Sequence, residues 1–251
     1  MNRSLITVTL CLSFSNALMS QSNEERRTKI QENERKEPSK EAIERRIRSI
    51  TRLKKEGVPT IDHLPVIEDS KGAKTRTVDE IAKRTIAVCL TAVKATGLDQ
   101  ATVETLVQNF GAEKFFSPKE AAFIKNPNPT QQERARFSWR YECYWVLLWA
   151  LGYIDRLEQP KGICDVQKAV DFLRKRTTAE FIKDAKLRPL ASILDEADLI
   201  YRYDWAVVNA RVKGEEAPAK LEAGVVSERH YVLNWLIGYL EQEWDEVSTD
   251  T

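Results

Sequence analysis

The sequence has few of the residues on which common catalytic and metal sites depend. Of its 251 residues, two are histidine and four are cysteine. His63 and His230 are far apart, and there is no His-Glu-x-x-His or Cys-x-x-Cys pattern, so a zinc site is not expected. The chain also lacks Gly-x-Ser-x-Gly, a Walker loop and Gly-x-Gly-x-x-Gly, which leaves a nucleophile elbow or a nucleotide site without support. We therefore expect no metal and no cofactor.

Glycine and proline are scarce, at nine residues each, and no stretch alternates apolar and polar residues as a half-buried strand does. Charged residues make up 31% of the chain and hydrophobic residues 42%, which is typical of a globular protein. The 39 basic and 38 acidic residues leave a net charge of +1, which argues against nucleic acid as the partner. The uncharged run at residues 143–154 is too short to cross a membrane.

Residues 1–20 have the pattern of a secretory signal peptide. Arg3 is their one charge, residues 5–12 are apolar or threonine, and small residues stand at Ser15 and Ala17. We expect export to the periplasm or the medium, with an unprocessed cytoplasmic protein as the alternative. Removal of this leader would leave three cysteines, and an odd number is more typical of buried thiols than of a disulfide framework.

Residues 21–38 are predicted to be a polar, charged arm, and residues 39–251 a helical domain. A helix is predicted from Ser39 to Gly57 because isoleucines recur at helical spacing. Its apolar face would consist of Ile43, Ile47, Ile50 and Leu53. An extended connector with two prolines follows at residues 58–76. The alternative is a small N-terminal helical unit that this connector joins loosely to the remainder.

From Thr77 onward the pattern is helical. Capping boxes begin at Thr77, Ser117 and Thr130, and each marks the N-terminus of a helix. Further helices are predicted after Asp99 and Asp165, at residues 189–213 and at residues 225–241.

The helix predicted at residues 131–153 is apolar on nearly all sides, which indicates burial at the centre of a domain. We expect the helices at 189–213 and 225–241 to pack against it. All six tryptophans fall at or after residue 139, so most of the aromatic core belongs to the C-terminal half. The predicted fold is a single all-α, multi-helix domain around a buried, Trp-rich central helix.

Charged side chains are embedded in the apolar parts of these helices. They are Arg140, Glu142, Asp195, Asp198, Arg202, Asp204, Glu228, Arg229 and His230. Burying an unpaired charge is costly, so these groups are expected to meet one another. They form either a structural network of ion pairs or a cleft in which a carboxylate with a raised pKa acts as acid or base. Asp198 and Arg202 are four residues apart and can pair on one helix face.

Two functional hypotheses remain. The leading one is a non-catalytic binding or interaction module for an unknown protein or small-molecule ligand, because tryptophan and tyrosine lie near charged residues. Its candidate binding residues are Arg140, Arg202, Arg229, Trp139 and Asp245. The alternative is a metal-independent hydrolase or lyase. Its candidate catalytic residues are Glu142, Asp198, Glu228 and His230.

The C-terminal tail, residues 244–251, is predicted to be docked on the domain. Trp244 is too large and apolar to be left in water, and its burial is worth about 2–3 kcal/mol. Asp245 or Asp250 is expected to pair with an arginine of the helical core.

Several short motifs follow one another in a characteristic order. They occupy residues 137–142, 145–152, 187–190, 194–202, 224–230, 233–235 and 244–251. Together they resemble the bacterial domain-of-unknown-function family DUF4272, over roughly residues 40–251 and including the connector at His63-Leu-Pro65. The resemblance implies a mostly helical single domain, mostly in cytoplasmic proteins without a leader, and residues 1–20 depart from that pattern. It implies no activity, cofactor or catalytic residue.

Overall fold

The computed structural model describes residues 24, 26, 28, 29 and 37–251. The chain divides into two units, Met1–Ser39 and Lys40–Thr251, and the description that follows concerns the second. The predicted signal peptide at residues 1–20 lies outside the described residues, as does most of the polar arm.

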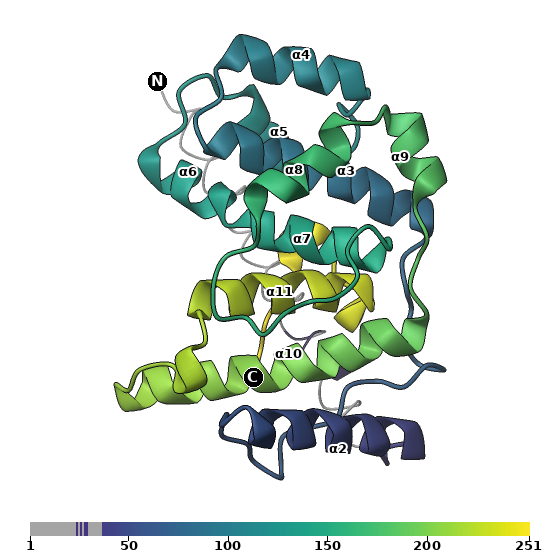
Figure 1. The fold of residues 1–251 in the computed structure, drawn as a ribbon, viewed down its shortest axis with the longest axis vertical. Helices are drawn as coiled ribbons and strands as arrows, with labels where there is room; N and C mark the ends of the chain where they lie inside the picture. The colour runs from purple at the N-terminus through teal and green to yellow at the C-terminus, as the bar shows by residue number, and fades with distance from the viewer. Residues whose placement is uncertain (1–23, 25, 27, 30–36) are drawn as a thin grey trace, which may run out of the picture. The chain divides into compact units, whose positions relative to one another are not determined.

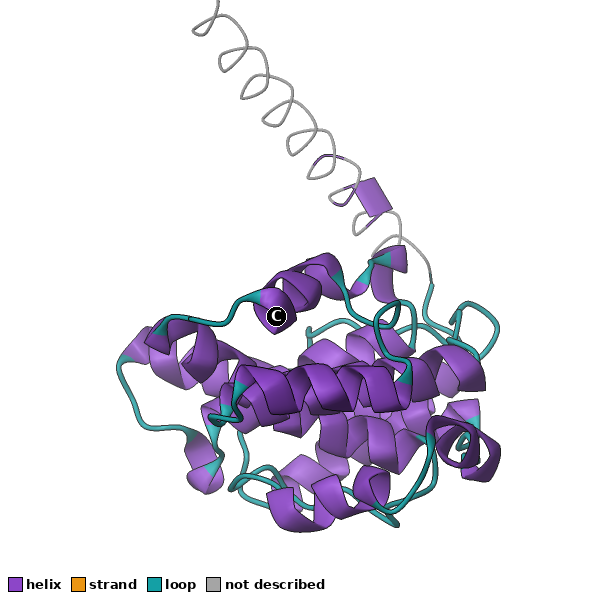
Figure 2. Ribbon diagram, turned by 90° about the horizontal axis from the view of Figure 1, so that it is seen from above, coloured by secondary structure: helices purple, strands orange, loops and turns teal. Residues whose placement is uncertain are grey.

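The second unit is built from helices and the loops that join them, and its residues form no strand (Figures 1 and 2). This confirms the predicted all-α class. The α-helices are α2 (Lys40–Lys55), α3 (Val78–Ala95), α4 (Gln100–Phe110), α5 (Pro118–Lys125), α6 (Gln131–Ser138), α7 (Arg140–Ala150), α8 (Val166–Arg174), α9 (Thr178–Asp184), α10 (Leu190–Lys213) and α11 (Ala223–Leu236). Short 3-10 turns lie between α10 and α11, at Pro218–Lys220, and after α11, at Tyr239–Glu241 and Trp244–Glu246.

Local sequence signals account for where these helices begin. The capping boxes at Thr77, Ser117 and Thr130 are all formed, with the side-chain oxygen accepting from the backbone N–H three residues on. Asp99 and Asp165 cap α4 and α8 as predicted. A fourth capping box begins α9, a helix that the sequence pattern did not predict.

The predicted helix at 131–153 is two helices. The helical hydrogen-bond pattern is interrupted at Trp139, and α6 and α7 lie on either side of it. Nearly every side chain of α7 is buried, in agreement with the predicted central position. Of its two tryptophans, Trp149 is buried and Trp145 is half-buried.

The helices stack in an order that differs from the predicted one. In Figure 1, α2, α10, α11 and α7 lie one above another, and α3 packs on α7 from the other side. We expected α10 to pack directly on α7, but its main neighbours are α11 and α2. Helix α3 is buried along most of its length, so α3 and α7 share the centre of the core.

Helix α2 packs through a different face from the predicted one. Ile43 and Ile47 are 37% and 55% exposed. The buried positions are Ala42, Arg45, Ser49 and Leu53. Of the predicted face, Leu53 is buried and Ile50 is half-buried, so the prediction was wrong for Ile43 and Ile47. Arginines of α2 pair with carboxylates of α10, so part of the contact between the two helices is polar.

The last helix is shorter than predicted and ends at Leu236. Gly238 follows with φ of +67°, and a Cβ there would collide with the carbonyl oxygen of Lys74. Only glycine fits this backbone conformation at so close an approach. The chain then turns toward Trp244, which is 4% exposed and confirms the predicted docking of the tail.

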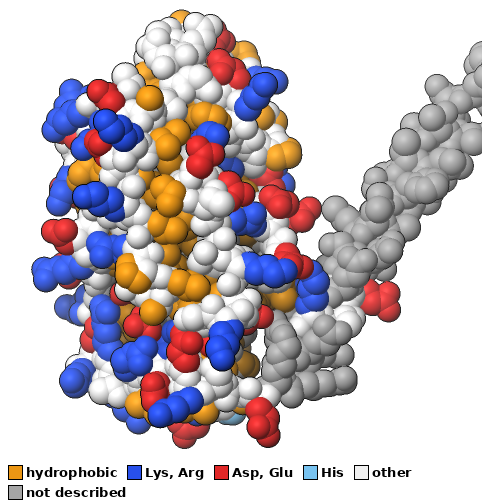
Figure 3. Space-filling view, turned by 90° about the vertical axis from the view of Figure 1, so that its right-hand side faces the viewer, with side chains coloured by type: hydrophobic (Ala, Val, Ile, Leu, Met, Phe, Trp, Pro, Cys, Tyr) orange, Lys and Arg blue, Asp and Glu red, His pale blue; other side chains and the backbone are white. Residues whose placement is uncertain are grey.

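One face of the molecule carries a band of apolar surface. Figure 3 shows the face at the right of Figure 1, where hydrophobic side chains run down the middle and charged side chains flank them. Folded proteins commonly expose apolar surface, so the band by itself assigns no partner. Among the described residues, no helix combines the length and the apolar character that crossing a membrane requires.

Candidate functional site

The first group of predicted site residues joins α7 to α11. Arg140 Nη1 donates to Glu228 Oε2 at 2.8 Å, and the Cys143 thiol lies 3.0 Å from the same oxygen. The guanidinium of Arg140 also lies 4.2 Å from the centre of the Tyr231 ring. Burial holds the pKa of the Cys143 thiol well above its ordinary value, so the thiol stays protonated and unreactive.

Glu142 and Arg229 form a second pair between the same helices. Arg229 Nε donates to Glu142 Oε2 at 3.2 Å, and the backbone N–H of Cys164 donates to Glu142 Oε1 at 2.5 Å. Arg229 also donates to the carbonyl oxygen of Glu158 at 2.8 Å. Both oxygens of Glu142 therefore accept a hydrogen bond, and the side chain is 2% exposed.

The third pair lies within α10, where the i, i+4 spacing predicted it. Arg202 donates to the two carboxylate oxygens of Asp198 at 2.9 and 2.8 Å, and both side chains are almost fully buried. The same guanidinium donates to the carbonyl oxygen of Pro65 at 3.2 Å. This pair therefore fixes the connector at residues 58–76 to α10.

His230 meets a residue that was not among the named candidates. Its Nδ1 lies 3.1 Å from Oδ2 of Asp204 on α10, and the imidazole is 1% exposed. The Tyr201 ring packs beside it at 5.8 Å. Asp204 belonged to the set of buried charges, but only the packing of α10 on α11 shows that it is the partner of His230.

Trp139 and Asp245 have structural contacts. The Trp139 ring lies so close to Gly224 that a Cβ there would be 2.5 Å from Cη2 of the indole. Asp245 accepts from Ser117 Oγ at 2.7 Å and from the Lys119 backbone N–H at 2.9 Å. The partners of Asp245 are thus the N-terminus of α5 and not the arginine that we expected.

A buried ion pair that the sequence did not indicate supports Trp244. Arg84 of α3 donates to Glu120 of α5 at 2.5 Å, and the Arg84 guanidinium lies 4.8 Å from the centre of the indole. Glu120 belongs to the Ser117 capping box, and this local role accounts for its place in the sequence without indicating that it also pairs with Arg84. Helices α3 and α5 and the tail are therefore joined through one charge cluster.

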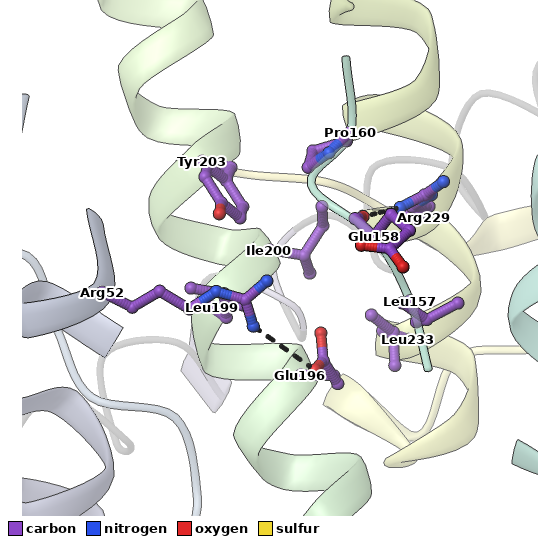
Figure 4. Close-up of a pocket in the computed structure, with 10 residues that line it drawn as sticks. All are labelled: Arg52, Leu157, Glu158, Pro160, Glu196, Leu199, Ile200, Tyr203, Arg229 and Leu233. Atoms are coloured by element: carbon purple, nitrogen blue, oxygen red, sulfur yellow. Dashed lines mark hydrogen bonds and ion pairs between the residues drawn. The ribbon is translucent and has the colours of Figure 1, made fainter. Parts of the chain in front are cut away.

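A small cavity lies between α2, α10 and α11. Figure 4 shows Arg52 and Glu196 extending toward one another at 3.9 Å, and Arg229 extending toward Glu158. Burial raises the pKa of Glu196 although Arg52 lowers it. The space is about 10 Å³, which is room for about one water molecule and not for a substrate.

A larger cleft lies between the C-terminal half of α10 and the start of α11, and its volume is about 500 Å³. Its walls include Asp204, Val207, Val208, Arg211, Gly214, Glu215, Ala217, Ala223, Ser227 and Thr249. The α10 members recur at i, i+3, i+4 and i+7, so they share one helix face. Asp204 is the only buried charge of the predicted set that borders this cleft.

The three buried ion pairs thus lie apart from the larger cleft. The Arg140–Glu228, Glu142–Arg229 and Asp198–Arg202 pairs bind each other and the backbone, and none of them borders the larger cleft. In the part of the chain that is described, no group of three or more His, Cys, Asp and Glu side chains could hold a metal ion.

These features define an all-helical protein whose internal charges are paired across its helices. A family model described as "Domain of unknown function (DUF4272)" matches residues 45–247. The chain belongs to this family, which confirms the resemblance of its motifs. No curated protein and no solved structure matches the chain.

Proposed function

We propose that this protein is a non-catalytic binding module and that its ligand occupies the cleft between α10 and α11. The observation that carries the proposal is the size of the cleft, about 500 Å³, which falls in the range of pockets that hold small ligands. Its walls combine four apolar side chains with five polar or charged ones, so the cleft offers both apolar contact and hydrogen-bonding groups. A near-neutral chain favours a small molecule or a protein side chain over nucleic acid as the occupant.

The placement of the candidate catalytic residues favours binding over catalysis. Glu142 and Asp198 have both carboxylate oxygens bonded, and His230 is enclosed. A general acid or base must reach the substrate within hydrogen-bond distance. The six tryptophans do not line this cleft. Trp149, Trp235 and Trp244 are buried, and Trp139, Trp145 and Trp205 are half-buried.

A ligand screen with two matched variants tests the proposal. Small molecules are screened by NMR against the wild type, against Val208→Phe, which fills the cleft, and against Val212→Phe. Val212 lies one turn further along α10, is 80% exposed and does not line the cleft. We expect ligands whose binding is lost in Val208→Phe and kept in Val212→Phe. Hits that bind both variants equally, or turnover of a bound compound, would overturn the proposal.

We also propose that residues 1–20 direct export. The support is the arrangement of one basic residue, an apolar stretch and small residues near Ala17 and Ser20. Determination of the N-terminus of the soluble product tests this. A start at Leu18 or Gln21 supports export, and an intact Met1 on a cytoplasmic protein contradicts it.

A further inference from the structure

We infer that the α10–α11 cleft takes an alkylammonium group, that is, a primary amine at the end of a short alkyl chain. The inference rests on the proposed function and adds to it the chemical class of the ligand. It is carried by a buried carboxylate at the cleft, by the balance of charge at its rim, and by its apolar walls.

Asp204 supplies the carboxylate. It is 5% exposed, it lines the cleft, and its one hydrogen-bond partner among the described residues is His230 at Oδ2. Oδ1 has no partner there. This oxygen is not among the buried polar atoms that lack a partner, so it is accessible from the cleft, and a cationic donor there could form a charge-assisted hydrogen bond with it.

The charges at the rim do not alter this preference. Arg211 and Glu215 are both exposed, and their charges cancel. Exposed charges are also screened by water and salt, whereas a buried carboxylate is screened much less. The field in the cleft therefore comes from Asp204, and it favours a cation over an anion.

The single available oxygen distinguishes between two kinds of cation. A guanidinium is recognised best by a carboxylate that offers both oxygens side by side. Asp204 has Oδ2 committed to His230 and offers one oxygen, which suits the compact, point-like charge of an ammonium group. Ser227 and Thr249 add hydroxyl acceptors for its other protons.

The walls indicate what is attached to the amine. Val207, Val208, Ala217 and Ala223 line the cleft with alkyl groups and offer no ring for stacking. An unbranched alkyl stem can bury itself against such walls while its ammonium head reaches Asp204. Two sources share this chemistry, a free aliphatic amine and the side chain of a lysine in another protein.

The inference is tested by NMR titration of the isotope-labelled full chain with compounds that have similar alkyl chains and differ in their head group. The probes are n-pentylammonium, 1-pentanol, pentanoate and n-pentylguanidinium. We expect the ammonium to bind at least about tenfold more tightly than the other three, since a charge-assisted bond is worth about that factor. A lysine-containing tripeptide, blocked at both ends, distinguishes the two sources. Tighter binding of the tripeptide indicates a protein lysine, and tighter binding of pentylammonium indicates a free amine.

Two variants locate the interaction. Asp204→Asn keeps the shape of the side chain and an acceptor for His230, and it should weaken pentylammonium binding at least about tenfold. Glu216→Gln removes an exposed carboxylate that does not line the cleft and should change binding less than about threefold. Unchanged melting temperatures show that both variants are folded, and Val208→Phe, which fills the cleft beside Asp204, is the second means of abolishing binding.

The outcomes separate this inference from the proposed function. If pentanol, pentanoate or the guanidinium binds as tightly as the ammonium and Val208→Phe abolishes that binding, the amine inference is overturned and the binding function stands. If pentylammonium binds Asp204→Asn as well as the wild type, the inference is also overturned. If the wider screen yields no ligand sensitive to Val208→Phe, both proposals fall.

Discussion

At the scale of single residues, several charges inside the core are paired with opposite charges and with backbone groups. Asp198 and Arg202 are the clearest case, because two hydrogen bonds join them and neither side chain is more than 2% exposed. Such a pair adds little net stability over an apolar pair, since both ions lose their hydration. Removing one partner alone is different, because the other charge is left buried and unpaired.

We therefore expect Arg202→Met to lower the free energy of unfolding by about 3–5 kcal/mol. The double variant Asp198→Leu with Arg202→Met removes both charges and should recover most of this loss. Urea denaturation of the wild type, both single variants and the double variant measures the coupling. Arg48→Met is the control, since Arg48 pairs with Asp195 at 2.6 Å but is 56% exposed. It should cost less than about 1 kcal/mol, and an equal cost at both sites would contradict the argument.

The contact between Gly224 and Trp139 gives a second prediction. Alanine at position 224 would place its methyl group 2.5 Å from the indole, so the ring or α11 must move. We expect Gly224→Ala to destabilise the protein by about 1–3 kcal/mol, as overpacking does. Gly162→Ala is the matched control, because no atom lies within 4 Å of a Cβ at that position. If Trp139→Leu does not relieve the effect of Gly224→Ala, the clash is not its cause.

The sequence could predict site contacts only where they are local. Asp198 and Arg202 pair because four residues of helix bring them to one face, and that spacing is visible without a structure. Arg140 meets Glu228 across 88 residues, and Glu142 meets Arg229 across 87. Those pairs depend on which helices are neighbours and on how each helix is rotated about its axis. The local sequence pattern indicates neither.

At the scale of whole helices, α2 shows why a periodic apolar pattern can mislead. Three isoleucines marked one face, yet the buried face carries Arg45. Arg45 is 1% exposed and reaches Asp195, Glu41 and the carbonyl oxygen of Glu68. The alkyl part of an arginine covers apolar surface while its head is bonded, so an arginine face can be the buried one. The starts of α3, α4, α5, α6 and α8 were predictable because their caps are local, although the similar cap of α9 was missed. The orientations of the helices depend on long-range partners.

The C-terminal tail provides the prediction at this scale. Truncation after Glu243 removes Trp244, which packs edge-on against Tyr231 and Trp235, and Asp245, which caps α5. Loss of the indole alone removes about 2–3 kcal/mol of burial. Since 1 kcal/mol shifts a protein of this size by about 2–4 °C, the melting temperature should fall by several degrees.

Truncation after Ser248 is the control for this experiment. It keeps Trp244, Asp245 and the Ser248 carbonyl that accepts from Asn234 at 2.8 Å. Calorimetry of this shorter truncation should show little change. If both truncations melt together with the full chain, residues 244–251 contribute nothing to the fold.

At the scale of the whole molecule, the sequence predicted that the protein is built from helices. It did not predict the order in which those helices pack. Scarce glycine, capping boxes and 3.6-residue periodicity indicate helices, and helices form. The same apolar character on α7, α10 and α11 does not say which of them is in the middle. The structure places α11 between α7 and α10, and this placement creates the cleft that ends at Thr249.

The described core holds three free thiols, and we expect them to make the protein less stable at alkaline pH. Cys89, Cys143 and Cys164 are buried and unpaired. Burial raises the pKa of Cys89 to about 12, and it also raises the pKa of the other two thiols. In the unfolded chain these thiols ionise near pH 8.5, so the unfolded state releases protons that the folded state keeps. The free energy of unfolding should therefore fall as pH rises above about 8.5.

The size of this effect follows from the same linkage. At pH 10, Cys89 has lost about 1.5 pH units' worth of stabilisation, or about 2 kcal/mol, and the raised pKa values of Cys143 and Cys164 add to the loss in the same direction. Since ordinary domains are stable by about 5–15 kcal/mol, this loss is a sizeable part of the total. Lys94 acts in the opposite sense, because burial lowers its pKa, whereas burial raises the pKa of tyrosines such as Tyr144 and Tyr231, which act in the same sense as the thiols. Urea denaturation at pH 7, 8, 9 and 10 measures the slope, and Cys89→Ala should reduce it by about 1.4 kcal/mol per pH unit. The slope is compared because the cavity left by the substitution lowers the free energy of unfolding equally at every pH. A free energy of unfolding that stays constant between pH 8 and 10 would show that the thiols ionise as readily in the folded chain as in the unfolded one.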